Sequence, residues 1–224
     1  MFDRIAPRYD AMNAVMTLGL DRGWRRAATG AAGLGPGMAA IDVACGSGAL
    51  TRELARRVGP HGRVVGVDAA TRMLARAGAH RQDASAAVPT WLEAEADALP
   101  LPDATMDAAT IAFGLRNVPD YGAALRELVR VTRPGGRVVI LELATPTSPL
   151  GQLVAATWFR HVVPRLGRLA GAGDAYRYLP SSVDTYPSPA RIADALRDAG
   201  TVAVRWWRLG LGMVTIHVGT RRPD

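Results

Sequence analysis

The chain of 224 residues contains a single cysteine, Cys45, and no lysine. One cysteine cannot form an intrachain disulfide, so the fold suits a reducing compartment such as the cytoplasm. Cys45 and the four histidines show none of the spacings that metal sites require, and we expect no bound metal. A chain of this length buries a core large enough to fold without a disulfide or a metal.

Long apolar runs are also missing. The longest uncharged stretch, residues 144–159, contains two prolines and several polar residues, so it is too short and too broken to span a bilayer. The first ten residues, MFDRIAPRYD, carry acidic side chains and no apolar segment, and we expect no signal peptide there. The sequence therefore predicts a protein that works from the aqueous side of any membrane.

The positively charged side chains are all of one chemical type. With 27 basic and 20 acidic residues the formal net charge is +7, and every basic residue is an arginine. We interpret this bias as the signature of a GC-rich genome rather than of function. No basic tract is interleaved with aromatic residues, so we do not expect nucleic-acid binding. Attraction to an anionic membrane surface or to an acidic ligand stays open.

Short apolar runs alternate with helical patterns along the middle of the chain, which is the order that parallel βαβ units produce. Five strands are expected, at residues 38–44, 63–68, 91–96, 107–113 and 137–143. Helices are expected at residues 49–58, 70–80, 121–130 and 191–200. Two final strands, at 202–207 and 213–219, are expected to form an antiparallel pair at the sheet edge. The sequence therefore predicts a doubly wound α/β fold with a seven-stranded, mostly parallel sheet.

We interpret residues 1–224 as one domain with four parts: a helical preface (1–37), a core (38–143), an insertion (144–189) and a C-terminal helix with edge strands (190–224). In doubly wound proteins ligands bind at the carboxyl edge of the strands, and the preface is expected to cover that edge. The insertion places four apolar residues on one helical face. That face fits an ordinary amphipathic helix packed on the core, a cap over an apolar substrate, or a lip that faces a membrane. The four residues are Leu150, Leu153, Val154 and Trp158.

The segment IDVACGSGAL joins the first strand to the next helix through a turn of small residues. Ala44, Gly46 and Gly48 let the backbone approach a ligand closely, and the helix N-terminus offers N–H groups with a partial positive charge. Asp68 ends the next strand, where a carboxylate can accept hydrogen bonds from two ribose hydroxyls. This combination predicts a nucleoside site, whereas the turn alone also fits an ordinary tight bend.

The details of the turn favour one kind of nucleoside. A dinucleotide site usually has a third glycine inside the helix, where this chain has Thr51. Asp42, inside the end of the first strand, suits instead an amino-acid-bearing nucleoside such as S-adenosyl-L-methionine (SAM), which has no pyrophosphate. The segment Glu95-Ala96-Asp97 can offer a side chain to the adenine amino group and a backbone N–H to its ring. We therefore predict SAM as cofactor and S-adenosyl-L-homocysteine as its product.

Several longer segments resemble one known family: FDRIAPRYDAMNAVMTLGLDRGWRR, DVACGSGALT, ADALPLPD, FGLRNVPDYGAALRELVRVTRPGGRVVILEL and YRYLPSSV. Over nearly the whole chain they resemble the quinone-ring C-methyltransferases of menaquinone and ubiquinone biosynthesis. FGLRN, RYDAMN and YRYL are far more specific than the glycine turn, which all SAM-dependent methyltransferases share. The resemblance implies the class I SAM-dependent methyltransferase fold and carbon methylation of a polyprenylated hydroquinone, most closely demethylmenaquinol to menaquinol.

The resemblance also implies a set of cofactor contacts. Ser47 keeps the hydroxyl of the family's usual threonine, and Cys45 stands where the family usually has glycine. Three positions depart from the family pattern: Ala49 replaces an acidic residue, Glu95 replaces Asn or Asp, and Ala112 replaces Ser. The expected cofactor-binding residues are Asp42, Cys45, Gly46, Ser47, Gly48, Asp68, Ala69, Glu95, Ala96 and Ala112.

Carbon methylation requires the methyl group to be held about 3–3.5 Å from the ring carbon and in line with it. The ring carbon becomes a good nucleophile when the neighbouring hydroxyl loses its proton, so the site needs a base or a positive charge that stabilises the phenolate. Arg116 and Asn117 follow the fourth strand and are expected beside the cofactor. Arg116 can stabilise the phenolate or orient a water, and Asn117 can orient the ring or the water. The alternative for Arg116 is an ion pair at the surface.

The preface and the insertion are expected to complete the site. The preface residues that can close it are Tyr9, Asp10, Asp21 and Arg22, and Asp21, where many family members have His, can serve as the base. The insertion residues expected to line the cap are Tyr176, Arg177 and Tyr178, with Tyr178 the catalytic candidate. Packing in the core is the alternative for the tyrosines. We interpret His217 as a structural histidine whose hydrogen bonds are satisfied.

Three functions are compatible with this pattern, and we favour the first, SAM-dependent C-methylation of a prenylated quinol. The second is methylation of a soluble aromatic compound, which the departures at Ala49, Glu95 and Ala112 motivate. The third is a quinone-binding assembly protein that keeps the fold without catalysis. The expected partner is a lipophilic quinol and the expected location is the cytoplasm. Peripheral contact with the inner face of the membrane and a homodimer stay open.

Overall fold

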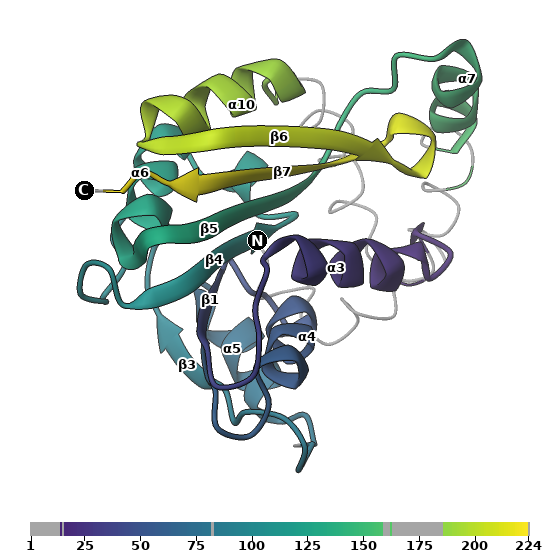
Figure 1. The fold of residues 1–224 in the computed structure, drawn as a ribbon. Helices are drawn as coiled ribbons and strands as arrows, with labels where there is room; N and C mark the ends of the chain where they lie inside the picture. The colour runs from purple at the N-terminus through teal and green to yellow at the C-terminus, as the bar shows by residue number, and fades with distance from the viewer. Residues whose placement is uncertain (1–13, 15, 82, 159–161, 163–185, 224) are drawn as a thin grey trace.

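The centre of the molecule is a seven-stranded sheet of order β3-β2-β1-β4-β5-β7-β6 (Figure 1). It is seen in a computed structural model that describes residues 14, 16–81, 83–158, 162 and 186–223. The strands are β1 (Ala39–Val43), β2 (Arg63–Asp68), β3 (Thr90–Glu93), β4 (Met106–Ala112), β5 (Thr132–Leu143), β6 (Thr201–Leu209) and β7 (Val214–Arg221). The first five pair in parallel, and β7 runs antiparallel to both of its neighbours. The predicted doubly wound, mostly parallel sheet with an antiparallel edge pair is confirmed.

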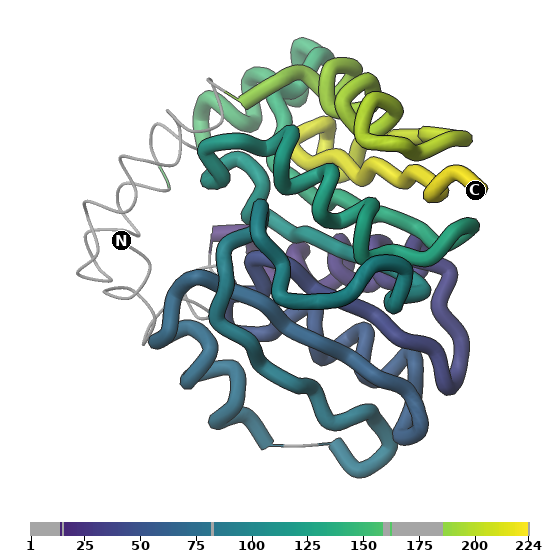
Figure 2. Tube along the Cα trace, turned by 90° about the vertical axis from the view of Figure 1, so that its left-hand side faces the viewer, coloured from purple at the N-terminus to yellow at the C-terminus, as the bar shows by residue number. Residues whose placement is uncertain are grey.

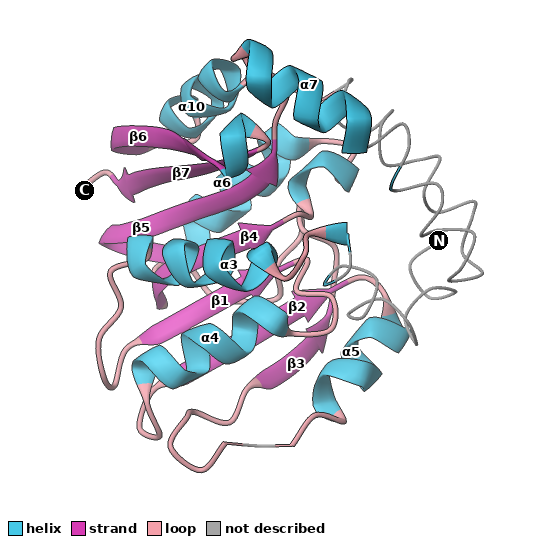
Figure 3. Cartoon of the chain, turned by 90° about the vertical axis from the view of Figure 1, so that its right-hand side faces the viewer, coloured by secondary structure: helices cyan, strands magenta, loops and turns pink. Residues whose placement is uncertain are grey.

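Helices cover both faces of this sheet. The described helices are α3 (Leu20–Ala31), α4 (Ala49–Val58), α5 (Thr71–Gly78), α6 (Tyr121–Val131), α7 (Pro149–Thr157) and α10 (Pro189–Asp198), with 3₁₀ turns η2 (Leu115–Asn117) and η4 (Gly210–Gly212). α3 and α4 lie over one face (Figure 3) and pack on it in one apolar cluster. α6 and α10 contribute to a second cluster, on the other face. Three helices begin at a side-chain cap: Ser148, Asp120 and Ser188 each accept a hydrogen bond from a backbone N–H in the first turn.

The alternation of side chains along β1 shows why both faces are apolar. Ala40 packs in the cluster with α3 and α4, whereas Ile41 and Val43 pack in the cluster with α6 and α10. Successive residues of a strand point to opposite faces, so Asp42 is directed to the same side as Ala40. Figure 2 shows the blue strands and α5 at one end of the sheet and the yellow-green C-terminal strands with α10 at the other.

The ends of two strands differ from the sequence prediction. β3 ends at Glu93, so Glu95 and Ala96 lie in the loop that follows rather than in the strand. β5 begins at Thr132, five residues before the predicted 137, and includes the RPGG segment. The pairing with β4 shifts there, because Met106 pairs with Thr132 whereas Ala108 pairs with Arg137. A bulge of this kind allows Gly and Pro to lie within a strand. In the sequence the RPGG segment has the pattern of a turn, so the bulge is not predicted from it.

α7 does not present its four apolar residues as a single packed face. Gly151 and Ala155 are its buried residues. Leu150 and Leu153 are 62% and 66% exposed. Side chains one helical turn apart share a face, so the small residues at 151 and 155 point inward together and leave the two leucines outward. The interpretation of α7 as an ordinary amphipathic helix is therefore wrong. Among the described residues, no helix combines the length and the apolar character needed to cross a membrane.

Candidate functional site

A cavity of about 180 Å³ lies at the carboxyl ends of β1, β2 and β4, where ligands bind in doubly wound sheets. Both polar and small residues line it. Six of the predicted cofactor-binding residues do so: Gly46, Asp68, Ala69, Glu95, Ala96 and Ala112. Met73, Phe113, Gly114 and Val118 also line it and were not predicted. We call this the cofactor cavity.

Asp68 is held in place by the backbone around it. Its Oδ2 accepts a hydrogen bond from the backbone N–H of Gly46 at 2.7 Å, and its Oδ1 accepts one from that of Ala70 at 2.8 Å. The first bond ties the end of β2 to the turn after β1. That turn contains three residues of positive φ, Ala44 at 50°, Gly46 at 55° and Gly48 at 79°. The carboxylate is thus fixed at the cavity wall, and a carboxylate can accept hydrogen bonds from hydroxyl donors.

Asp42 lies behind the turn rather than in the cavity wall. It is 1% exposed, and its carboxylate accepts hydrogen bonds from Thr51 at 2.6 Å and from Thr110 at 2.9 Å. Burial raises the pKa of this carboxyl from 3.8 to about 6, while the two hydroxyls and the charge of Arg25 act in the opposite direction. The alternation along β1 directs Asp42 toward α4, which carries Thr51. It therefore braces β1, α4 and β4 together.

Cys45, Ser47 and Gly48 also do not line the cofactor cavity. Cys45 is 9% exposed, and burial raises the pKa of its thiol well above the usual range. Ser47 is buried, and its backbone carbonyl accepts a hydrogen bond from Arg52. A Cβ atom at Gly48 would lie 2.5 Å from the ring of Trp91.

Trp91 supports the turn from this far side. A Cβ atom at Gly66 in β2 would also lie 2.5 Å from the Trp91 ring, and 3.2 Å from the Cys45 sulfur. Glycine at both positions therefore makes room for one indole. Gly48 adopts φ 79°, a conformation that glycine reaches without steric cost. Gly48 was predicted to allow close approach of a ligand. In the structure, packing against Trp91 also requires glycine at this position, and it requires glycine at Gly66, which was not predicted.

Arg116 forms a buried ion pair that sequence reasoning missed. Its Nη1 lies 2.5 Å from Oε1 of Glu142, with the side chains 10% and 0% exposed. The same Nη1 donates to the carbonyl of Phe113 at 2.6 Å, and Glu142 also accepts from the backbone N–H of Arg116. The alternative of a surface ion pair is wrong, because this pair is removed from solvent. Glu142 sits in the RVVILEL run, and a carboxylate inside an otherwise apolar strand was the available signal.

Two polar atoms at this pair are buried without a hydrogen bond to any described residue. They are the Nε of Arg116 and the Oδ1 of Asn117. Asn117 lines the cofactor cavity, and Arg116 lines a second one. Buried polar atoms are rarely left unpaired, and an unpaired amide oxygen at a cavity wall is suited to a ligand donor. η2 thus places the two predicted catalytic residues in the walls of different cavities, Asn117 in the cofactor cavity and Arg116 in the second one.

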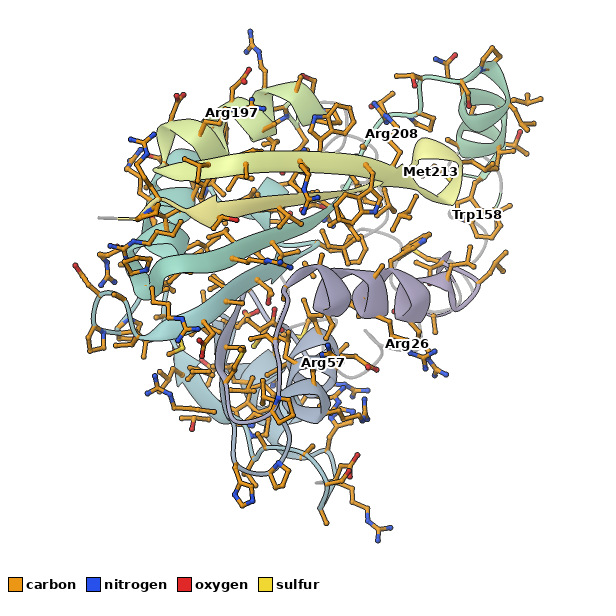
Figure 4. All side chains as sticks on the ribbon, viewed as in Figure 1. Arg26, Arg57, Trp158, Arg197, Arg208 and Met213 are labelled. Atoms are coloured by element: carbon orange, nitrogen blue, oxygen red, sulfur yellow. The ribbon has the colours of Figure 1, made fainter. Side chains whose placement is uncertain are left out.

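The second cavity has a volume of about 280 Å³ and a mostly apolar lining. Its wall is built from α3, α7, η4 and the ends of β4 and β5, and includes Trp24, Leu143, Val154, Trp158 and Met213. Figure 4 shows Trp158 and Met213 close together above α3. Phe113 lines both cavities. We call this second one the apolar cavity.

Asp21 is the carboxylate in the lining of the apolar cavity. It accepts a hydrogen bond from Thr17 at 3.0 Å, and its Oδ2 lies 3.6 Å from the Nε of Arg25. Arg25 in turn lies over the ring of Phe113, 5.2 Å from its centroid. The predicted base is therefore held inside the apolar cavity, next to the residue that the two cavities share.

The remaining candidates fall in three groups. Tyr9, Asp10, Tyr176, Arg177 and Tyr178 lie outside the described residues. Arg22 is exposed on α3. His217 is 1% exposed, and its Nε2 lies 2.9 Å from the carbonyl of Pro189 while its ring stacks on Trp206. Its Nδ1 has no hydrogen-bond partner in the described part of the chain, so this histidine is structural and has one of its two ring nitrogens paired there.

Fold and site together define a class of protein. A doubly wound sheet with a small-residue turn, a carboxylate after β2 and an adjoining apolar cavity is the construction of a class I SAM-dependent methyltransferase. Solved structures share this fold. A SAM-dependent methyltransferase from Thermotoga maritima matches with a TM-score of 0.67 at 18% identity, covering 99% of this chain and 98% of that one. The [4+2]-cyclase SpnF matches with a TM-score of 0.65 at 16% identity, covering 91% and 82%.

The particular family follows from the sequence comparisons. The chain belongs to the ubiE/COQ5 methyltransferase family, which it matches over residues 1–221. A demethylmenaquinone methyltransferase of Thermus thermophilus is 44% identical and covers 99% of this chain and 100% of its own length. One of Mycolicibacterium paratuberculosis is 42% identical, covering 100% and 93%. A ubiquinone/menaquinone biosynthesis C-methyltransferase of Syntrophotalea carbinolica is 41% identical, covering 99% and 92%. The predicted family is confirmed, and the protein is a methyltransferase.

Proposed function

We propose that this enzyme methylates a ring carbon of a polyprenylated hydroquinone, with SAM as methyl donor and demethylmenaquinol as acceptor. The observation that carries the proposal is the pair of cavities that share Phe113, one polar and one apolar. A methyl donor and an oily aromatic acceptor need such neighbouring sites. The family relatives named demethylmenaquinone methyltransferase support the choice of acceptor.

The residues of the cofactor cavity fit SAM. Asp68 can accept hydrogen bonds from the two ribose hydroxyls, and Glu95 can accept from the adenine amino group. The small side chains of Gly46, Ala69 and Ala112 leave the space that a nucleoside occupies. The amide side chain of Asn117 is a further polar group in the lining of this cavity. When bound, SAM supplies an electrophilic methyl group on a positively charged sulfur.

The chain's own residues must then prepare the acceptor. The ring carbon gains a methyl group and loses a proton, and it becomes nucleophilic when the neighbouring hydroxyl is deprotonated. Asp21 is the carboxylate placed to take that proton, since it lines the apolar cavity. Arg116 lines the same cavity and carries a permanent positive charge, which stabilises the phenolate. Glu142 fixes the direction of the Arg116 guanidinium by holding Nη1.

The apolar cavity also excludes water from the reacting ring. Trp24, Val154, Trp158 and Met213 offer it hydrocarbon and aromatic surface, and few polar atoms compete with the ring hydroxyls. In such surroundings a hydrogen bond from Arg116 to a phenolate is stronger than in water, while the carboxylate of Glu142 offsets part of the charge of Arg116. The preface and the insertion therefore contribute the surface that selects an oily ring.

The test is mass spectrometry of the quinones in a host that lacks its own ring methyltransferase. With this chain present, we expect a quinone one methyl group heavier, and with Asp68→Ala we expect much less of it. Calorimetric titration with SAM and S-adenosyl-L-homocysteine checks the cofactor separately. Absence of binding to both would overturn the proposal. SAM binding without a methylated product from any acceptor would favour the non-catalytic assembly protein.

A second candidate is methylation of a soluble aromatic compound by the same site. Two of the residues that depart from the family pattern, Glu95 and Ala112, line the cofactor cavity. They favour this candidate because they alter the surroundings of the cofactor. Comparing the rates with a prenylated quinol and with its ring lacking the prenyl chain distinguishes the two. A higher kcat/KM for the bare ring would replace the quinol as the proposed acceptor.

A further inference from the structure

We infer that the mouth of the apolar cavity is a docking face for an anionic lipid bilayer. The inference rests on the proposed function, because a membrane is where a polyprenylated acceptor resides. Exposed side chains, their position around one cavity and the charges beside them support it.

Five exposed leucines gather at this mouth. Of the eight large hydrophobic side chains exposed among the described residues, five are leucines, with exposed fractions from 53% to 71%. Three of the five line the apolar cavity itself. The other two lie on α7, on either side of the buried Gly151 and next to Val154 of the cavity wall. The five are Leu18, Leu20, Leu150, Leu153 and Leu211, and we call them the leucine rim.

The elements that carry the leucine rim lie on one side of the molecule. The start of α3, α7 and η4 all lie at the right-hand side of Figure 1, which Figure 3 shows face on. α7 is joined closely to η4, because a Cβ atom at Gly151 would collide with the backbone carbonyl of Leu211. Leu150 and Leu153 are therefore held outward by a fixed contact. A helix that buries glycine and alanine and exposes leucine is arranged to meet an apolar medium.

The charges around the leucine rim match an anionic surface. The segments 16–31, 145–158 and 205–214 contain five arginines and a single carboxylate. That carboxylate, Asp21, is 13% exposed and lines the apolar cavity, so it adds little charge to the outer face. Arg22 and Arg26 are exposed on α3, whereas Arg205 is exposed in the middle of β6, opposite Val218 of β7. Figure 4 shows Arg26 on the side of α3 away from Met213 and Trp158, flanking the apolar surface. Basic side chains beside exposed leucines are the combination that binds anionic lipid.

Another exposed hydrophobic residue provides a contrast. Val88 is 71% exposed and precedes β3, at the other end of the sheet. The described residues from 83 to 97 include four exposed carboxylates, those of Asp83, Glu93, Glu95 and Asp97, and no arginine. Arg56 pairs with Asp83 and Arg81 lies nearby, so this surface carries charges of both signs. Val88 is equally exposed but lies at the opposite edge of the sheet from the leucine rim, so it provides the control position.

Co-sedimentation with phospholipid vesicles tests the inference. We expect binding to vesicles that contain phosphatidylglycerol, weaker binding to pure phosphatidylcholine, and a loss of binding as salt is raised. The double variant Leu150→Glu/Leu153→Glu should bind at least about 10-fold more weakly, because two charges would have to enter the lipid interface. Val88→Glu should bind as the unchanged protein does. Arg22→Glu/Arg26→Glu is a second, independent variant, expected to remove the preference for anionic lipid.

A pair of activity measurements separates this inference from the proposed function. Leu150 and Leu153 do not line the apolar cavity, so the double variant should keep its rate with a short-chain quinol in solution. Its rate with a long-chain quinol embedded in vesicles should fall with vesicle binding. If no quinol is methylated, the proposed function fails, and vesicle binding still decides the docking face. Methylation of both quinols without vesicle binding, or a dimer in solution that the double variant dissociates, would overturn the docking face.

Discussion

The two cavities on either side of Phe113 are assembled in different ways. The cofactor cavity is lined by strand ends and the loops directly after them, with two carboxylates and several small residues. The apolar cavity draws on α3, the end of β5, α7 and η4, which are far apart in the sequence, and its wall is mostly hydrocarbon. The sheet therefore provides one half of the site, whereas the other half depends on long-range packing. Changes to the first should act on cofactor affinity, and changes to the second on the acceptor.

The largest effect is expected at the boundary of the two halves. Glu142→Ala leaves the buried Arg116 without its partner, which should lower the free energy of unfolding by about 3–5 kcal/mol. Denaturant unfolding measures the change. Arg126→Ala is the control, because the pair of Arg126 with Asp120 is exposed and spans 3.9 Å, and less than about 0.5 kcal/mol is expected. Equal changes in the free energy of unfolding for the two variants would show that the buried pair of Arg116 and Glu142 does not stabilise the fold.

Two buried titratable groups, His217 and Asp42, should change the free energy of unfolding in opposite directions as the pH falls. Burial lowers the pKa of His217 from 6.5 to about 4, so acid protonates the unfolded chain first and stability falls between these values. The pKa of Asp42 is raised from 3.8 to about 6, so the folded chain takes up its proton first and gains stability over nearly the same range. Each group contributes roughly 3 kcal/mol at full titration.

His217→Gln should reveal this balance, because glutamine can still donate to the carbonyl of Pro189 but does not titrate. As the pH falls from 6.5 to 4, the variant's free energy of unfolding should rise relative to that of the unchanged protein. Asp42→Asn should show the reverse relative change. Unfolding curves at several pH values measure both, and parallel pH profiles in all three proteins would contradict the assignment.

On the cofactor side, Asp68→Ala should weaken SAM binding by roughly 100-fold. The variant loses the proposed acceptor for two hydroxyls, each charged hydrogen bond contributing about 1.5–3 kcal/mol, and releases the N–H groups of Gly46 and Ala70. Calorimetry gives the Kd, and acceptor binding should stay unchanged. Asp97→Ala is the control, since Asp97 is exposed and does not line the cavity. An unchanged Kd in Asp68→Ala would remove this residue from the proposed site.

On the acceptor side the effect should be smaller. Met213→Ala removes part of the apolar wall, and the KM for the quinol should rise by about 10-fold, or about 1.4 kcal/mol. The Kd for SAM should not change. Met73→Ala is the mirror variant, because Met73 lines the cofactor cavity, and it should alter the Kd for SAM and not the KM for the quinol. A change of both constants in either variant would mean that the cavities are not independent.

The same division explains what the sequence could predict. Local sequence patterns predict the five parallel strands, the turn after β1 and the position of Asp68. This is possible because each strand and the loop that follows it are contiguous in the sequence. The partner of Arg116 could not be found this way. Glu142 lies 26 residues further along the chain, and only the pairing of β4 with β5 brings it beside η2.

The roles of single residues within a motif were also beyond sequence reasoning. Asp42 and Gly48 belong to the glycine turn, yet one braces three elements and the other makes room for Trp91. The apolar positions of α7 suggested one face, and the contact of Gly151 with η4 decided which residues turn inward. These outcomes depend on neighbours that pack from distant parts of the chain.

Phe113 has a consequence for anyone who would redesign this enzyme. Its φ of 58°, its backbone bonds to Leu141 and Arg116 and its ring contacts with Trp24 and Arg25 fix it firmly, and it belongs to both linings. A substitution there is pleiotropic, because it alters the room for donor and acceptor at once. Libraries aimed at new acceptors are better directed at Val154, Trp158 and Met213, where selection on one ligand leaves the other undisturbed.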